Sequence, residues 1–132
     1  MKAMEIRKQL KAFFPFLGRA NIILTDQEYD NIYSDDLRGE IIDVVTEGDC
    51  DDASRKLEYH IRDIRGHLQW PVGRVLLDKV AGNKINHSMI VAICNDGVFL
   101  VEPQAVWDIG IKGMQKMWKA NKKDDHFYSV YI

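Results

Sequence analysis

Along the first part of the chain, apolar residues recur at the three- and four-residue spacing of amphipathic helices. Over residues 3–14 the apolar positions lie among charged ones and include Met4, Leu10, Phe13 and Phe14. This pattern predicts a helix that ends near Pro15, because proline cannot donate a helix hydrogen bond. Thr25 followed by Glu28 matches a capping box, which predicts a short helix starting at Asp26.

Two further helices are predicted before residue 67. The first is capped by Ser34 and would bury Leu37, Ile41, Ile42 and Val45. The second begins at Cys50, with Asp49 or Gly48 near its cap, and ends at Gly66. Its inner face consists of residues at helical spacing, namely Ala53, Ser54, Leu57, Ile61 and Ile64.

After Trp70 and Pro71 the pattern changes to short runs of β-branched and apolar residues. The runs cover residues 74–80, 87–93 and 98–102, with the turn sequences AGNK and CNDG between them. They predict an antiparallel meander. A helix over about 109–121 is weakened by its glycines, and 126–132 predicts a last strand. Helices followed by a sheet predict an α+β fold, in a single domain of residues 1–132.

Composition and charge exclude several classes of function. The chain has 132 residues, 46% of them hydrophobic and 29% charged, which is typical of a globular protein. A net charge of −2 gives no general attraction to nucleic acid. No apolar run reaches the roughly 18 residues that a membrane span needs. Charges interrupt the apolar N-terminal residues, which argues against a signal peptide, so we expect a cytoplasmic protein.

Cys50 lies in the sequence GDCDDASRKL, at the predicted first turn of a helix. A helix N-terminus stabilises an anion and lowers the pKa of a cysteine, so this position suits a nucleophilic thiolate. The two cysteines are too few for a disulfide framework, although one bridge between Cys50 and Cys94 stays open. We read Cys94, in the predicted turn, as structural.

A nucleophilic cysteine needs a histidine as its base and a third group that orients the histidine. His60 would lie roughly 15 Å along the helix from Cys50, and His67 farther still. His126 has acidic residues only as its chain neighbours. His87 opens the central predicted strand, and Glu102 lies diagonal to it if Ile93 pairs with Val98. A tight turn at Asp96 and Gly97 would instead separate them.

The order of these three residues resembles the bacterial transglutaminase-like cysteine peptidases, in the papain-related superfamily. The resemblance covers residues 47–104, in GDCDDASRKL, the strand beginning RVLL, and HSMIVAICNDGVFLVEPQ. It implies a transglutaminase-like, papain-like fold, with the cysteine-bearing helix packed on an antiparallel sheet. It also implies a catalytic triad of Cys50, His87 and Glu102. The family usually has aspartate where this chain has Glu102.

Two parts of the expected site are not settled by the sequence. The Cys50 amide would be one oxyanion donor, and the candidates for the other are Tyr29, Asn31 and Tyr33. The aspartates at 49, 51 and 52 suit helix capping, but their charge opposes thiolate formation. Because some members of the wider family bind calcium, the resemblance also allows a calcium site at Asp49 and Asp51. No other cofactor is expected.

The sequence thus predicts a hydrolase of the thiol protease type, or an acyl transferase, acting on the amide bonds of a protein or peptide substrate. Cys50 would attack the carbonyl, His87 would carry the proton and Glu102 would orient His87. Ordinary structural roles for Cys50 and His87 stay open. The alternatives are an inactive domain of the same fold that binds or inhibits another protein, and a calcium-responsive interaction module. The oligomeric state is not indicated.

Overall fold

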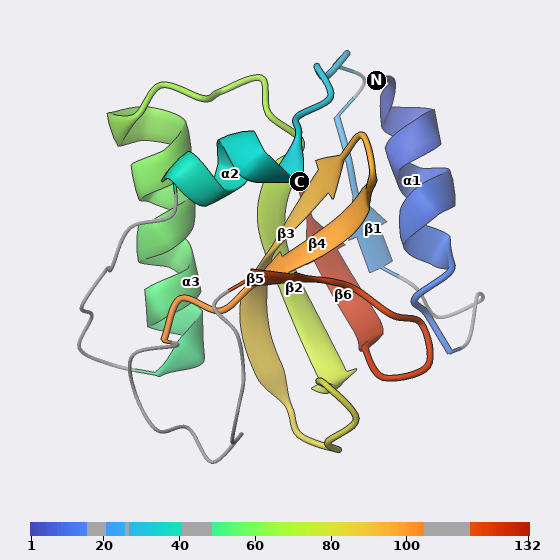
Figure 1. Cartoon of the computed structure of the whole chain (residues 1–132). Helices are drawn as coiled ribbons and strands as arrows, with labels where there is room; N and C mark the ends of the chain where they lie inside the picture. Colours follow the sequence, from blue (N-terminus) through green and yellow to red (C-terminus); the bar gives the residue numbers. More distant parts are fainter. Residues whose placement is uncertain (16–20, 26, 41–48, 105–116) are drawn as a thin grey trace.

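The structure is a computed structural model that describes residues 1–15, 21–25, 27–40, 49–104 and 117–132 (Figure 1). It has α+β architecture. In the described residues the helical elements are α1 (Ala3–Lys11), α2 (Ser34–Glu40), α3 (Cys50–Tyr59) and η2 (His60–Ile64). The strands are β1 (Asn21–Ile23), β2 (Val72–Lys79), β3 (His87–Cys94), β4 (Gly97–Val101), β5 (Met117–Lys119) and β6 (His126–Tyr131).

One six-stranded sheet joins all the described strands, in the order β1-β6-β2-β3-β4-β5. The strands β2, β3 and β4 form the antiparallel meander that the sequence predicts, and β6 pairs antiparallel with β2. The short strand β1 pairs parallel to β6, which makes the sheet mixed. Every residue of β3 is buried, as expected for a central strand with both faces covered.

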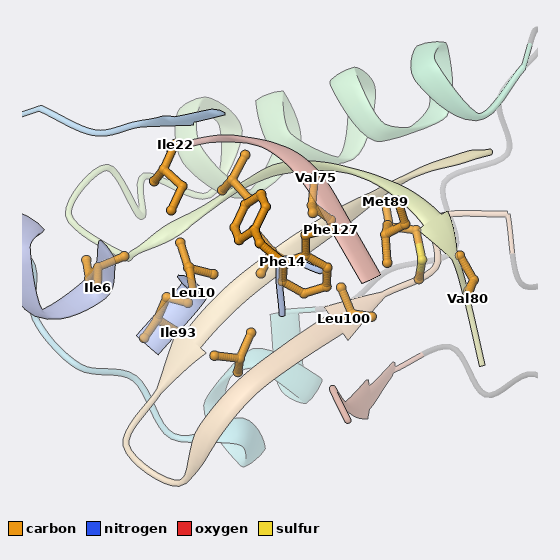
Figure 2. Close-up of a cluster of buried hydrophobic side chains, with 14 of the residues drawn as sticks. Ile6, Leu10, Phe14, Ile22, Val75, Val80, Met89, Ile93, Leu100 and Phe127 are labelled. Atoms are coloured by element: carbon orange, nitrogen blue, oxygen red, sulfur yellow. The ribbon is translucent and has the colours of Figure 1, made fainter. Parts of the chain in front are cut away.

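Apolar clusters cover the two faces of the sheet. One cluster packs α1 against the sheet through Ile6 and Leu10, and it includes Phe127 and Leu100 (Figure 2). The other cluster packs α2 and α3 against the opposite face. Its members are Ile32, Leu37, Leu57, Ile61, Val72, Ile90, Ala92, Cys94, Phe99 and Val101. Alternate residues of β3 therefore belong to different cores.

The start of α3 confirms the predicted helix at Cys50. Asp49 is its N-cap, and the Asp49 side chain accepts hydrogen bonds from the backbone amides of Asp51 and Asp52. The helix continues as the π-helical turn η2 and stops at Gly66, whose φ of 79° is accessible mainly to glycine. The cap thus fixes Cys50 as the first helical residue.

The hairpin of β3 and β4 has the register on which the predicted pairing of His87 and Glu102 depends. Ile93 pairs with Val98, and Ile90 pairs with Val101 at the far end of the ladder. Continued by one residue, this register sets Glu102 opposite Met89. Glu102 is then diagonal to His87 across the two strands. Cys94 pairs with Gly97, so the turn consists of Asn95 and Asp96 and is shorter than a loop over 94–97. The alternative turn at Asp96 and Gly97, which would have separated the two residues, does not occur.

Two predicted helices are wrong where the structure describes them. Residues 27–33 are not helical, because the Tyr29 amide donates to the Met1 carbonyl and Glu28 forms an isolated antiparallel β-bridge with Lys2. Thr25 bonds the Tyr29 hydroxyl instead of capping a helix. The end of the predicted helix at 109–121 is the strand β5, and residues 109–116 lie outside the described part, as do Ile41, Ile42 and Val45.

Membrane insertion through a helix finds no support in the described ranges. None of the helices there combines the length and the apolar character that crossing a bilayer requires.

Candidate active site

The centre of the candidate site is a buried hydrogen bond between His87 and Glu102. His87 is the first residue of β3, and its Nε2 contacts Glu102 Oε2, just after β4 ends. The other carboxylate oxygen of Glu102 accepts the backbone N–H of Gln104 at 2.9 Å. Glu102 has no exposed surface and His87 is 8% exposed. Two contacts therefore fix the carboxylate, and the carboxylate fixes the imidazole.

Cys50 approaches this pair from the start of α3. The helix packs on β2 and β3, and the backbone of Ser88 is close enough to the Cys50 thiol to lower its pKa. Ser88 directly follows His87, so the thiol lies at the end of β3 that carries the imidazole. Within the described residues, no hydrogen bond joins the thiol to the His87 ring. The structure thus brings the three predicted residues to one end of the sheet and joins two of them.

The environment of Cys50 disfavours the thiolate. Burial raises the pKa of the thiol, and the negative charges of Asp51, Asp49 and Glu102 raise it further. The Ser88 amide lowers the same pKa, because it stabilises a negative sulfur. The net direction is upward, so the surroundings of Cys50 favour the protonated thiol.

The aspartates at the start of α3 are engaged in capping. Asp49 Oδ1 accepts the amides of Asp51 and Asp52 at 3.1 and 3.4 Å. Asp52 Oδ2 in turn accepts a hydrogen bond from the Asp49 amide at 3.2 Å. In the ranges that the structure covers, no three acidic, histidine or cysteine side chains gather as cation ligands. Calcium binding at Asp49 and Asp51 therefore stays a prediction.

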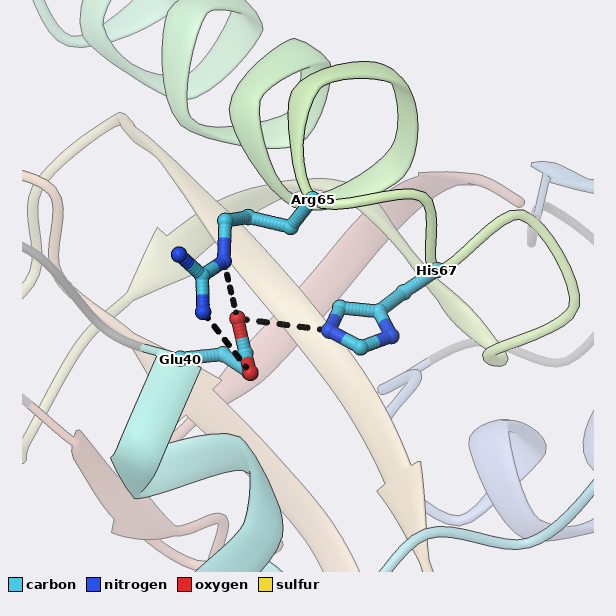
Figure 3. Close-up of polar contacts among 3 residues, drawn as sticks. All are labelled: Glu40, Arg65 and His67. Atoms are coloured by element: carbon cyan, nitrogen blue, oxygen red, sulfur yellow. Dashed lines mark hydrogen bonds and ion pairs between the residues drawn. The ribbon is translucent and has the colours of Figure 1, made fainter.

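His67 is engaged far from Cys50. Its Nε2 lies 3.2 Å from Glu40, which also accepts from Arg65 at 2.8 Å (Figure 3). The His67 ring stacks on Trp70 with 3.7 Å between centroids. The hydrogen bond from Arg65 is the main reason that the pKa of Glu40 is lowered. These contacts tie the end of α2 to the chain after η2, at the opposite end of the helix from the thiol.

Two of the three upstream candidates for the second oxyanion donor, Asn31 and Tyr33, lie at the other end of β3 from Ser88. Ile32, which lies between Asn31 and Tyr33, forms an isolated parallel β-bridge with Cys94 at the end of β3. The Ile32 carbonyl accepts a hydrogen bond from the Asn95 amide. Six residues of extended strand, about 20 Å, separate Cys94 from Ser88. Tyr29, for its part, is buried and bonds Thr25. The Cys50 amide remains the expected donor.

Both cysteines are free, so the alternative of a bridge between Cys50 and Cys94 is wrong. Cys94 is 1% exposed and pairs with Gly97 at the turn between β3 and β4. Burial raises its pKa to about 12, which makes it an inert internal reference for the reactivity of Cys50.

Two serines near Cys50 were not predicted to belong to the site. Ser88 acts through its backbone amide, which a pattern of side chains cannot reveal. Ser54 lies one helical turn after Cys50 and is fully buried, and among the described residues its hydroxyl has no hydrogen-bond partner. A serine on the inner face of a helix is the one feature that could have drawn attention to it.

Comparison with known proteins finds no matching family model, no matching curated protein and no matching solved structure.

We expect Glu102→Ala to lower the free energy of unfolding by about 3 kcal/mol, because it leaves a buried imidazole and the Gln104 amide without their acceptor. Denaturant unfolding measures the change. The matched control is Glu28→Ala, whose partner Lys2 is 3.6 Å away on the surface. The control should cost less than about 0.5 kcal/mol. Equal small losses for both variants would contradict the buried pairing.

We expect Asp51→Asn to speed the alkylation of Cys50 by iodoacetamide at pH 8 about twofold to fivefold. Removing one negative charge lowers the raised pKa of the thiol, and the thiolate is the reactive form. Peptide mass mapping locates the label. We expect it on Cys50 and not on Cys94. Asp63→Asn, at the other end of the same helical segment, is the control and should react like the wild type. An unchanged rate in Asp51→Asn would refute this electrostatic coupling.

Proposed function

We propose that the protein is a cysteine-dependent amide-bond hydrolase or acyl transferase with a transglutaminase-like, papain-related fold. The observation that carries the proposal is the buried hydrogen bond of His87 to Glu102, at the end of β3 where the Ser88 amide meets the Cys50 thiol. A carboxylate, an imidazole and a thiol in this order are the parts that thiol-based acyl chemistry requires.

Each residue has a defined chemical role in this proposal. His87 donates from Nε2 to Glu102, which leaves Nδ1 as the acceptor for the thiol proton. The Cys50 sulfur bonds to the carbonyl carbon as His87 takes that proton. His87 returns the proton to the amine as the C–N bond breaks, which leaves a thioester on Cys50. Water then releases a carboxylic acid, or an amine releases a new amide, and the thiol is regenerated.

The raised pKa of Cys50 favours one version of this mechanism. Surroundings that raise the pKa of the thiol disfavour a resting ion pair between thiolate and imidazole. His87 therefore acts as a general base during the attack, and Glu102 stabilises the imidazolium that forms. The amide of Cys50, at the positive end of α3, is the proposed donor to the oxyanion.

The raised pKa also supports a second candidate function. A protein of the same fold that binds or inhibits a partner would need no activated thiol, and no hydrogen bond links Cys50 to His87 in the described residues. In that case the buried pair of His87 and Glu102 would serve only to hold β3 and β4 together. Acyl transfer to Cys50 separates the two functions, because only the enzyme accelerates it.

The proposed substrate is a protein or peptide, and the proposed location is the cytoplasm. Two free cysteines suit a reducing compartment, where a catalytic thiol also stays active. We propose no nucleic-acid or membrane partner.

The test of the proposed function is acetyl transfer from p-nitrophenyl acetate. We expect release of nitrophenolate with an acetyl group on Cys50, and no such reaction in Cys50→Ala. His87→Asn should slow acylation at least 100-fold, because general-base catalysis contributes about that much or more. His126→Asn and Cys94→Ala are matched controls that should react within about twofold of the wild type.

Two outcomes would overturn the enzymatic assignment. The first is acetylation of other residues with no acetyl group on Cys50. The second is equal acylation rates in folded His87→Asn and in the wild type. Cys50→Ala keeps the test informative if the His87 variant does not fold, because Cys50 is only partly buried.

A further inference from the structure

Ser54 is a polar residue in an apolar position. It lies on the inner face of α3 with Ala53 and Leu57, and none of these three residues has exposed surface. Among the described residues, the Ser54 hydroxyl is the one buried polar side-chain atom that makes no hydrogen bond. A buried hydroxyl without a partner destabilises a fold, so its presence calls for an explanation other than stability.

The geometry of the helix brings this hydroxyl to the candidate nucleophile. Cys50 is the first residue of α3 and is partly buried, and Ser54 follows it by four residues. The Cβ atoms of two residues at this spacing lie about 5–6 Å apart on one side of a helix. Every Cα–Cβ bond of a helix tilts toward the N-terminus, so the Ser54 side chain leans toward the turn that contains Cys50.

The other side chains one helical turn from Ser54 do not offer it a partner. Asp51 is exposed, Leu57 is apolar, and Glu58 is ion-paired with β2 at 3.0 Å. The helix packs on β3, whose backbone pairs with β2 on one side and β4 on the other. The Cys50 sulfur is therefore the side-chain acceptor toward which the hydroxyl can turn.

We propose that Ser54 is a positioning residue whose hydroxyl donates a hydrogen bond to the Cys50 sulfur when the sulfur becomes negatively charged. The inference rests on the proposed function and adds a residue to its site. A thiol sulfur is a weak acceptor, which agrees with a hydroxyl that is not bonded to it in the resting protein. A thiolate is a charged acceptor, and hydrogen bonds to charged groups are about twice as strong as neutral ones.

A hydrogen bond that forms only with the charged sulfur contributes to the reaction and not to the resting fold. As His87 takes the thiol proton, rotation about the Cα–Cβ bonds of Cys50 and Ser54 brings the sulfur and the hydroxyl together. The bond then stabilises the state in which the sulfur attacks, and the resting state gains nothing from it. This difference explains a buried hydroxyl that costs stability at the base of the site.

Ser54→Ala separates this role from a structural one. Alkylation of Cys50 by iodoacetamide at pH 8 should become slower by about threefold or more, because the thiolate loses a donor. The midpoint of denaturant unfolding should stay the same or rise, because the change removes a buried group without a partner. All solutions contain EDTA, so that no cation at Asp49 and Asp51 contributes. A structural hydroxyl would give the opposite result, a lower midpoint with an unchanged rate.

Ser54→Thr and Ser54→Val form a matched pair. Both introduce a β-branched side chain of similar shape, and only the first keeps a hydroxyl. Because both add the same bulk to a buried position, the comparison between them isolates the hydroxyl. Cys50 should be alkylated about threefold or more faster in Ser54→Thr than in Ser54→Val.

Ser34→Ala is the control for the loss of a buried serine. Ser34 is 8% exposed, and its hydroxyl donates to Asp96 at 3.1 Å, in the turn between β3 and β4. This turn lies at the opposite end of β3 from His87. Ser34→Ala should lower the unfolding midpoint, because Ser34 has a partner, and should leave the alkylation of Cys50 unchanged.

An alkylation rate in Ser54→Ala equal to that of the wild type would overturn the role of Ser54, and so would equal rates in Ser54→Thr and Ser54→Val. These outcomes are separate from the test of the proposed function. If acetylation of Cys50 depends on His87 while Ser54→Ala is alkylated like the wild type, the enzyme stands and the role of Ser54 fails. If Ser54→Ala slows alkylation but acetylation does not depend on His87, the hydrogen bond stands and the proposed chemistry fails.

Discussion

The register between β3 and β4 is the constraint on which the candidate site depends. Every residue of β3 is buried, so a shift of one position would exchange the two faces of the strand between different cores. That cost fixes Val101 opposite Ile90, and the next residue, Glu102, can then reach His87. Packing over both faces of the sheet therefore determines which carboxylate orients the imidazole.

At Cys50 two electrostatic influences oppose each other. The start of a helix and the Ser88 amide favour a negative sulfur, whereas burial and the nearby carboxylates disfavour it. In the free protein the second influence is larger. In the proposed mechanism the thiol gains its reactivity from His87 as a base, so surroundings that favour the protonated thiol are compatible with that mechanism.

Local patterns in the sequence predicted much of this arrangement. The cap at Asp49, the helix beginning at Cys50 and the hairpin were readable because each depends on neighbouring residues. The pairing of His87 with Glu102 depended on the register of the hairpin, which the sequence left open between two turns. The capping pattern at Thr25 misled because tertiary contacts of Tyr29 outweigh the propensity of one short helical turn.

Other parts could not be read from local patterns. The parallel strand β1 depends on β6, which lies at the opposite end of the chain. The irregularities in the ladder between β2 and β6, at Tyr128 and Asp78, arise only when these strands pair, and neither strand alone indicates them. The approach of the Ser88 amide to Cys50 requires the packing of α3 on the sheet. Long-range pairing, which a single sequence does not encode locally, determines these features.

The most direct measurement is a crystal structure of the protein after reaction with a small peptide aldehyde. An aldehyde adds reversibly to an active thiol and imitates the tetrahedral intermediate. The account predicts density continuous from the Cys50 sulfur to the aldehyde carbon, with the His87 ring within hydrogen-bond distance of the adduct and still bonded to Glu102. An unmodified Cys50, or an adduct that the His87 ring does not reach, would contradict it.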